Sequence, residues 1–181
     1  MTAALSKCIP CQKISKPWNE SYISFLYLDG VRDWIQDIKS NLRPERYGEL
    51  KRSHLPEFNK KYDGLVPVSS DPRSSAKKLF CSAEVLAQRV SKILKIPIFK
   101  NAFSRREFLS SQHDLNRVQR LLFLNQAVTL NLQISESLPQ KILLIDDVMT
   151  TGASLEIHAK LIKTRNCEVD VFCLARTPKF I

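Results

Sequence analysis

The chain has 181 residues, which is enough for one domain with a sizeable core and too few for two large domains. Hydrophobic residues make up 44% of the chain and charged residues 25%, so its composition is globular and excludes a disordered or fibrous protein. With 28 Lys and Arg against 18 Asp and Glu, the net charge is +10, which favours an anionic partner such as a phosphorylated small molecule or a nucleic acid.

No run approaches the roughly 18 apolar residues of a membrane span, and residues 1–15 lack the apolar core of a secretory signal, so we expect a cytoplasmic protein. The five cysteines are an odd number at irregular spacings, which argues against a disulfide framework. Only Cys8 and Cys11 have the Cys-x-x-Cys spacing of zinc ligands. A tetrahedral zinc site needs four donor atoms, and this motif supplies two of them. The motif therefore fits either part of a zinc site or a chain terminus that binds no metal.

In chain order, the first predicted element is a strand at residues 22–28, which are aromatic and apolar. An amphipathic helix follows the turn at residues 29–30. Its apolar face is formed by Val31, Trp34, Ile35 and Ile38. Residues 41–61 are polar and basic, and they predict short helices and loops.

The central part of the chain begins with a predicted buried strand at residues 62–68 and a polar loop at residues 69–74. A long helix is expected at about residues 75–94. Its predicted core positions are Leu79, Ala83, Leu86 and Val90. Residues 96–99 predict another short strand.

The last third alternates between strand and helix. Residues 104–120 are basic with few apolar positions and predict an exposed loop, and residues 127–132 predict a strand. Residues 142–145 are fully apolar, as expected for a central parallel strand, and a helix at 154–165 leads to a strand at 169–174. The helix residues expected to face inward are Leu155, His158, Leu161 and Ile162. This order predicts an α/β fold with a mainly parallel sheet.

The segment that indicates chemistry joins the apolar strand at residues 142–145 to the following helix. Asp146 and Asp147 stand at the carboxyl end of the strand, where open α/β sheets bind ligands. In the next turn, Gly152 permits close approach of a ligand, and the first N–H groups of the helix attract an anion. Further donors come from the hydroxyls of Thr150, Thr151 and Ser154. The pattern predicts a binding site for one phosphate group.

Two carboxylates beside a phosphate site need a further explanation, because they would repel the same anion. They could accept hydrogen bonds from hydroxyl groups or hold a divalent cation. A ribose 5-phosphate satisfies both halves of the site, with its diol on the acids and its phosphate on the turn. The alternative is that these residues only cap the helix, although a cap needs one such residue rather than several.

The segment IDDVMTTGAS at residues 145–154 resembles the phosphoribosyl pyrophosphate (PRPP) signature of type I phosphoribosyltransferases. This resemblance implies an α/β, type I phosphoribosyltransferase-like fold with a mainly parallel central sheet flanked by helices. It implies that Asp146 and Asp147 bind the ribose hydroxyls, with one of them influencing the charge near the reacting sugar carbon. The 5-phosphate would be held by Thr150, Thr151, Gly152, Ala153 and Ser154. The diphosphate, with Mg²⁺ between it and the sugar, would lie at Ser69, Ser70 and Arg73.

Type I enzymes also keep a flexible loop that closes over the diphosphate, and the resemblance places Arg105 and Arg106 in that loop. Closure would exclude water and bring cations to the departing charge. A solvated basic loop and a contact with nucleic acid are the alternative interpretations of the same residues.

Over nearly the whole chain, the order of motifs is similar to that of the ComF (competence protein F) family. In chain order these motifs are Cys8 with Cys11, Gly30 with Ile35 and Lys39, residues 63–68, Phe80 with Ala83 and Leu86, Arg105 with Gln112 and Arg120, the signature, and residues 174–177. ComF-like proteins pair a cysteine-rich zinc module with a phosphoribosyltransferase domain and are linked to the uptake of transforming DNA. The resemblance implies a short Cys-containing segment at 1–20, like a truncated zinc module, and a phosphoribosyltransferase-like domain at 21–181.

The chain departs from the family at Ser69 and Ser70, where ComF-like proteins tend to have Pro and Leu. Serine hydroxyls are competent donors, so the loop stays compatible with phosphate. Two functions then fit the sequence. One is Mg²⁺-dependent transfer of the 5-phosphoribosyl group from PRPP to an unknown nitrogenous acceptor. The other is a non-catalytic accessory role in DNA uptake with binding of single-stranded DNA. The sequence leaves the acceptor, zinc binding and the formation of a homodimer open.

Overall fold

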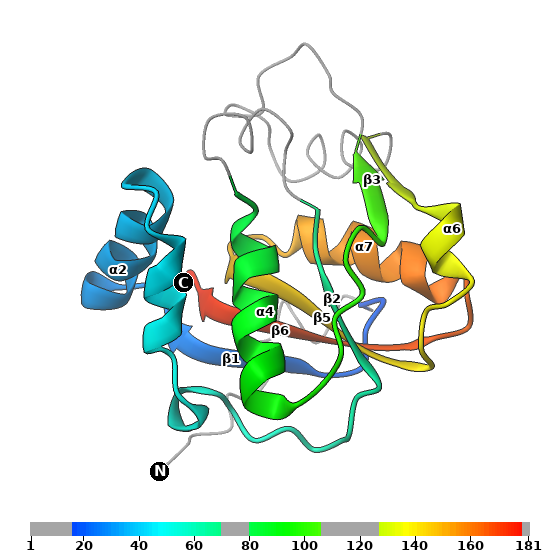
Figure 1. Cartoon of the computed structure of the whole chain (residues 1–181), viewed down its shortest axis with the longest axis horizontal. Helices are drawn as coiled ribbons and strands as arrows, with labels where there is room; N and C mark the ends of the chain where they lie inside the picture. Colours follow the sequence, from blue (N-terminus) through cyan, green and yellow to red (C-terminus); the bar gives the residue numbers. More distant parts are fainter. Residues whose placement is uncertain (1–15, 70–79, 106–126, 179–181) are drawn as a thin grey trace.

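The computed structural model describes residues 16–69, 80–105 and 127–178 and shows a parallel four-stranded sheet in the order β1-β6-β5-β2 (Figure 1). Its strands are β1 (Ser21–Leu26), β2 (Gly64–Pro67), β5 (Lys141–Met149) and β6 (Glu168–Arg176). A separate antiparallel pair consists of β3 (Phe103–Arg105) and β4 (Val128–Leu130). The predicted α/β class with a mainly parallel central sheet is confirmed.

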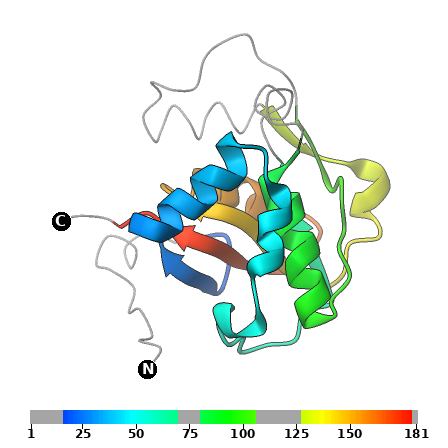
Figure 2. The ribbon, with the colours of Figure 1, turned by 60° about the vertical axis from the view of Figure 1, so that its left-hand side comes forward.

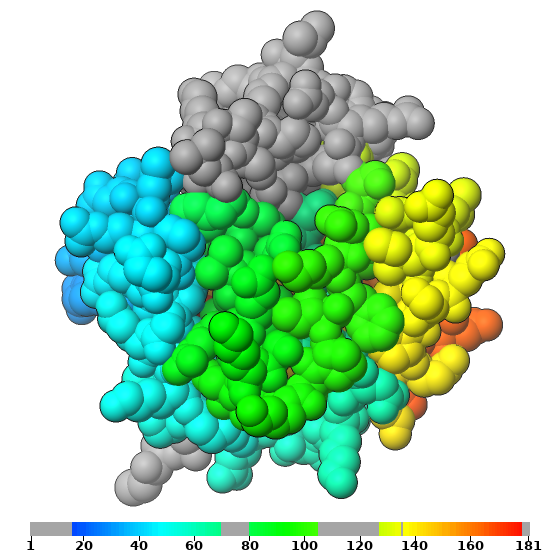
Figure 3. Space-filling model, viewed as in Figure 1, coloured from blue at the N-terminus to red at the C-terminus, as the bar shows by residue number. Residues whose placement is uncertain are grey.

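Helices cover both faces of this sheet. They are α2 (Asp29–Ser40), α4 (Ser82–Leu94), α6 (Leu132–Ser135), α7 (Ala153–Lys163) and the 3₁₀ helices η1 (Pro44–Glu49) and η2 (Arg52–His54). Figures 1 and 2 show α2 and α4 on the same side of the strands, and in Figure 3 α4 and the η1 region cover that side. Among the described residues, no helix has the length and apolar character needed to cross a membrane.

The core divides along the alternation of side chains in the strands. Leu143 and Ile145 of β5 pack in one buried cluster with Ile35 of α2 and Leu86 of α4. Their neighbours Ile142 and Leu144 pack in a second cluster with Leu155 and Ile162 of α7. Because β5 and β6 are buried on both faces, their apolar runs are continuous, as expected for central parallel strands. Asp146 and Asp147 follow this apolar run within β5, three and two residues before its last residue, and are therefore held by a rigid strand.

Most predicted elements are present, but the long helix predicted from about residue 75 does not run unbroken through residues 80 and 81. The helix α4 begins at Ser82, and Cys81 before it has an extended backbone with φ −91° and ψ 113°. Ala83, Leu86 and Val90 are buried as expected. Residues 70–79, and with them the expected core position Leu79, lie outside the described residues.

The strand predicted at residues 96–99 is reduced to a single bridge between Ile98 and Leu65. Lys95 and Asn101 both have left-handed backbones, with φ 60° and 56°, which bend the chain on either side of this bridge. The exposed loop predicted from residue 104 also begins later than expected, because Ser104 and Arg105 belong to β3 and pair with β4. Residues 106–126 lie outside the described part of the chain.

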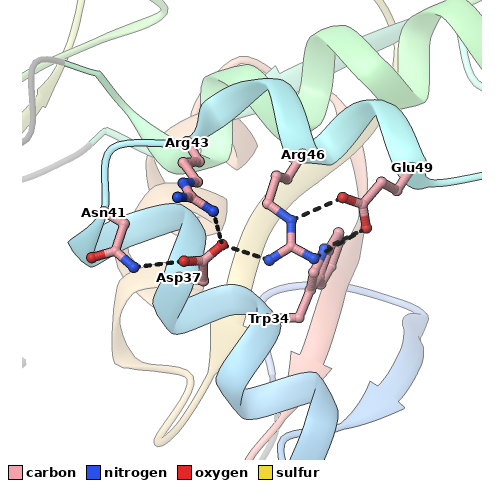
Figure 4. A network of polar contacts seen from close by, with 6 residues as sticks. All are labelled: Trp34, Asp37, Asn41, Arg43, Arg46 and Glu49. Atoms are coloured by element: carbon pink, nitrogen blue, oxygen red, sulfur yellow. Dashed lines mark hydrogen bonds and ion pairs between the residues drawn. The ribbon is translucent and has the colours of Figure 1, made fainter.

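Polar contacts fix α2 against η1 (Figure 4). Arg46 of η1 is ion-paired with Asp37 of α2, and its Nε lies 2.8 Å from Oε1 of Glu49. Trp34 donates its indole N–H to the other oxygen of Glu49 at 2.9 Å. Hydrogen bonds from Asn41 and then Arg46 lower the pKa of Asp37. Single exposed ion pairs contribute little, but together these contacts hold the last turn of α2 in place.

Candidate sugar-phosphate site

Two neighbouring strands end at the candidate site. In the parallel pair of β2 and β5, Pro67 is opposite Ile145, and the backbone N–H of Val68 donates to the carbonyl of Ile145 at 2.9 Å. Ser69 lies two residues after the end of β2, and Asp146 follows Ile145 within β5. Pairing thus brings predicted diphosphate and ribose residues to the same edge of the sheet.

The two acids have different surroundings. Asp147 is 7% exposed, and its Oδ2 lies 2.7 Å from Nζ of Lys39 in the last turn of α2. Asp146 is half-buried, and its Oδ1 accepts the backbone N–H of Asp147 at 2.8 Å. One carboxylate is therefore neutralised by a lysine, while its neighbour is oriented by the backbone.

The Lys39 ammonium stays charged in this environment. Burial lowers the pKa of Lys39, but the charge of Asp147, its hydrogen bond and the charge of Asp146 outweigh burial, so the pKa is raised above 10.5. The ion pair reduces the negative charge that an anionic ligand would meet at this edge. In the sequence, Lys39 stands out only as part of the family pattern, because no local signal connects the end of this helix with a distant strand.

Two other ionisable side chains near the acids are kept neutral. Tyr47 is 1% exposed, its hydroxyl lies 2.6 Å from Oγ of Ser82, and burial followed by the charge of Asp147 raises its pKa. Cys173 of β6 is opposite Asp146, and burial followed by the charges of both acids raises the pKa of its thiol well above 9.0. A protonated, fully buried thiol is a packing residue rather than a nucleophile.

The turn between β5 and α7 has the shape of an anion-binding helix start. Gly152 is the residue before the helix, with a left-handed φ of 78°, and its carbonyl accepts the N–H of Glu156 at 2.9 Å. The N–H of Ala153 donates to Oγ1 of Thr151 at 3.3 Å. Since the first N–H groups of a helix have no partner within the helix, the start of the 11-residue α7 can receive a phosphate.

The structure places the other predicted site residues as follows. Thr150 and Thr151 are exposed on the turn, Ala153 is buried, and Ser154 is half-buried in the first turn of α7. Arg105 is the last residue of β3, and only its backbone is described. The predicted residues outside the described part of the chain are Ser70, Arg73, Arg106, Cys8 and Cys11. Within the part that is described, Cys81, Cys167 and Cys173 form no disulfide, and no three His, Cys, Asp or Glu side chains group as metal ligands.

A parallel sheet flanked by helices, with two acids late in β5 that lead into a glycine turn, matches the type I phosphoribosyltransferase-like fold expected from the sequence. No family model matches the chain. The chain is 26% identical over 184 residues to Competence protein F of Haemophilus influenzae, and the alignment covers 93% of this chain and 78% of that protein. This similarity confirms the predicted resemblance to ComF-like proteins.

Two solved structures are also similar to the chain at low identity. The purine phosphoribosyltransferase from Pyrococcus horikoshii is 15% identical, with a TM-score of 0.37, over 90% of this chain and 92% of that one. The adenine phosphoribosyltransferase from Leishmania tarentolae is 13% identical, with a TM-score of 0.41, over 88% of this chain and 84% of that one. These alignments are loose, and no residue of the site is assigned from them.

Replacing Lys39 by Met keeps the length of the side chain but leaves the nearly buried Asp147 without its cation. We expect the free energy of unfolding at neutral pH to fall by about 2 kcal/mol, measured by urea denaturation. The matched control is Lys92→Met, because Lys92 is exposed on α4 and its loss should change stability by less than about 0.5 kcal/mol.

The same pair predicts a pH dependence. A pKa that is raised in the folded state gives stability that is complete below the ordinary value of 10.5 and lost as the pH rises through the folded value. The stability difference between the wild type and Lys39→Met should therefore be constant from neutral pH to about pH 10 and shrink above it. A difference that persists at high pH would contradict the ion pair.

The variant Gly152→Ala tests the left-handed turn. An added Cβ would meet Trp18 at 3.9 Å and Met149 at 4.0 Å, which are ordinary contacts, so only the positive φ opposes the substitution. We expect a loss of about 1 kcal/mol in the free energy of unfolding. Gly30→Ala is the control, because Gly30 lies in the first turn of α2 with open space around it and should tolerate alanine. Equal stability of the two variants would contradict the described turn.

Proposed function

We propose that the chain binds PRPP with Mg²⁺ and transfers the 5-phosphoribosyl group to a nitrogenous acceptor. The observation that carries this proposal is the pair of acids Asp146 and Asp147 late in β5, from which the chain leads through the left-handed Gly152 into the start of α7. Carboxylates that can accept hydrogen bonds from sugar hydroxyls therefore lie next to N–H groups that can bind an anion. A sugar-phosphate requires both. The similarity to Competence protein F supports the same class of fold.

In this proposal each part of the ligand has its own partners. The ribose hydroxyls donate to Asp146 and Asp147, and the 5-phosphate accepts from the N–H groups and hydroxyls of residues 150–154. Ser69, beside β5, is the first of the residues expected at the diphosphate, and Ser70 and Arg73 are expected after it. Lys39 limits the repulsion between the acids and this strongly negative ligand.

The Mg²⁺ ion is expected to arrive with the diphosphate. Magnesium keeps several of its waters and binds through substrate phosphates with few protein carboxylates, so the two acids at the strand end fit such an ion. When bound, it neutralises charge on the departing diphosphate. Zinc binding by Cys8 and Cys11 is a separate prediction.

The chemical step that we propose is a substitution at the sugar carbon. The bond from this carbon to the diphosphate oxygen breaks and its electron pair leaves with the diphosphate. The acceptor nitrogen forms the new bond and loses its proton to solvent. The nearby carboxylate charge stabilises the positive sugar of the transition state, and Arg105 and Arg106 are expected to meet the leaving group.

A thermal-shift experiment with PRPP and Mg²⁺ tests the site. Ligand at about 100 times its dissociation constant should stabilise the fold by roughly 2.7 kcal/mol. Asp146→Asn should remove most of this shift while leaving the Lys39–Asp147 pair intact, and the variant with both acids changed to Asn should remove all of it. Asp33→Asn, at a carboxylate exposed on α2, is the matched control and should keep the wild-type shift.

The absence of any shift with PRPP, ribose 5-phosphate or diphosphate would contradict the proposed site. Transfer itself is measured as diphosphate release that depends on an added base, in a screen of purines, pyrimidines and orotate. PRPP binding without release in this screen would favour the second function.

The second function is a non-catalytic accessory role in DNA uptake, favoured by the similarity to Competence protein F and by the net charge of +10. It predicts single-stranded DNA binding whose affinity falls by roughly 0.7 log unit per log unit of salt for each phosphate contacted. Fluorescence anisotropy with a labelled oligonucleotide at several salt concentrations measures this slope. Binding should survive Asp146→Asn, and its absence at low salt would exclude this function.

A further inference from the structure

A fully buried histidine connects the two segments that the proposed ligand would touch. His158 of α7 is 0% exposed, and its Nε2 lies 3.0 Å from the backbone N and 2.8 Å from Oγ of Ser69. Its Nδ1 lies 2.7 Å from the backbone carbonyl oxygen of Ser154. The sequence predicts that this side chain faces inward among apolar residues, and the burial is confirmed.

These partners determine which ring nitrogen carries the proton. The backbone N–H of Ser69 can only donate, so Nε2 is an acceptor, and the carbonyl of Ser154 can only accept, so Nδ1 is the donor. His158 is therefore a neutral imidazole protonated on Nδ1. The ring of Phe103 packs edge-on at 4.4 Å between centroids with an interplanar angle of 85°, which fixes the plane of the imidazole.

The two partners of His158 come from different sides of the candidate site. Ser154 lies in the first turn of α7, which is proposed to hold the 5-phosphate. Ser69 follows β2 and is the first residue proposed for the diphosphate. Ser154 and His158 belong to the same helix, so Ser69 is the partner that could otherwise shift relative to α7, because it follows a strand of only four residues. The imidazole joins them through one rigid ring.

We propose that His158 is a positioning residue that sets the spacing between these two anion-binding segments and so favours a sugar that carries two separated phosphate groups over a sugar monophosphate. The inference rests on the proposed function and deepens it, since it concerns which ligand the site prefers. His158 itself touches neither phosphate. Its effect passes through the backbone and hydroxyl of Ser69.

Binding of PRPP with Mg²⁺ and of ribose 5-phosphate, measured by calorimetry, tests the proposal. His158→Phe keeps an aromatic ring but loses both hydrogen bonds, and we expect PRPP to bind about tenfold more weakly while ribose 5-phosphate changes by less than about threefold. His158→Gln retains a donor and an acceptor and should restore part of the PRPP affinity. Phe103→Leu is the packing control and should not change the ratio of the two affinities.

Equal losses for the two ligands in His158→Phe, or no loss for either, would overturn the proposal. If that variant does not fold, His158→Gln and the free wild-type protein still test it. In the free protein, nitrogen NMR should show His158 protonated on Nδ1 and not on Nε2, and the amide of Ser69 should be protected from hydrogen exchange. The opposite tautomer, or an unprotected Ser69 amide, would overturn the inference.

The wild type could bind neither ligand and still show the tautomer protonated on Nδ1 and a protected Ser69 amide. In that case the proposed function and the ligand preference fail, while the link between the segments stands.

Discussion

The parallel pairing of β2 with β5 determines where every proposed ligand group lies. Val66 is opposite Leu144 and Pro67 is opposite Ile145, so the last residue of β2 lies beside the residue that precedes Asp146. The pairing is held by burial on both faces, since Leu65 and Leu143 pack toward α4 while Val66 and Leu144 pack toward α7. A slip in this register would separate Ser69 from the acids and turn the wrong side chains toward each helix.

Electrostatics at this edge explain how a site with two carboxylates can accept an anion. The start of α7 carries a partial positive charge, and the Lys39 ammonium offsets the charge of Asp147, so the ligand would meet less negative charge than two isolated carboxylates carry. A nearly buried ion pair is weak evidence for stability alone, because desolvation offsets much of the attraction. We therefore infer that this pair adjusts the charge of the site. The contacts among Asp37, Arg46 and Glu49 hold the last turn of α2, which also carries Lys39 (Figure 4).

The sequence predicted those features that are encoded locally. The apolar run of β5, the acids that end it and the turn at Gly152 are contiguous, so their arrangement could be foreseen before any contact was known. The start of α4 at Ser82 and the reduction of the predicted strand at residues 96–99 to a single bridge depend on the backbone conformations of Cys81, Lys95 and Asn101. The spacing of apolar residues carries no information on these conformations. The Lys39–Asp147 pair and the His158–Ser69 bond join residues distant in the chain, and no spacing rule indicates them.

The central claim is that the turn between β5 and α7 holds a sugar-phosphate, with carboxylates on one side and backbone N–H groups on the other. A crystal structure of the protein with PRPP and Mg²⁺ tests it most directly. The account predicts the 5-phosphate at the N–H groups of residues 151–154 and the ribose hydroxyls within hydrogen-bond distance of Asp146. An ordered ligand bound elsewhere, or an intact turn that stays empty at saturating PRPP, would contradict it.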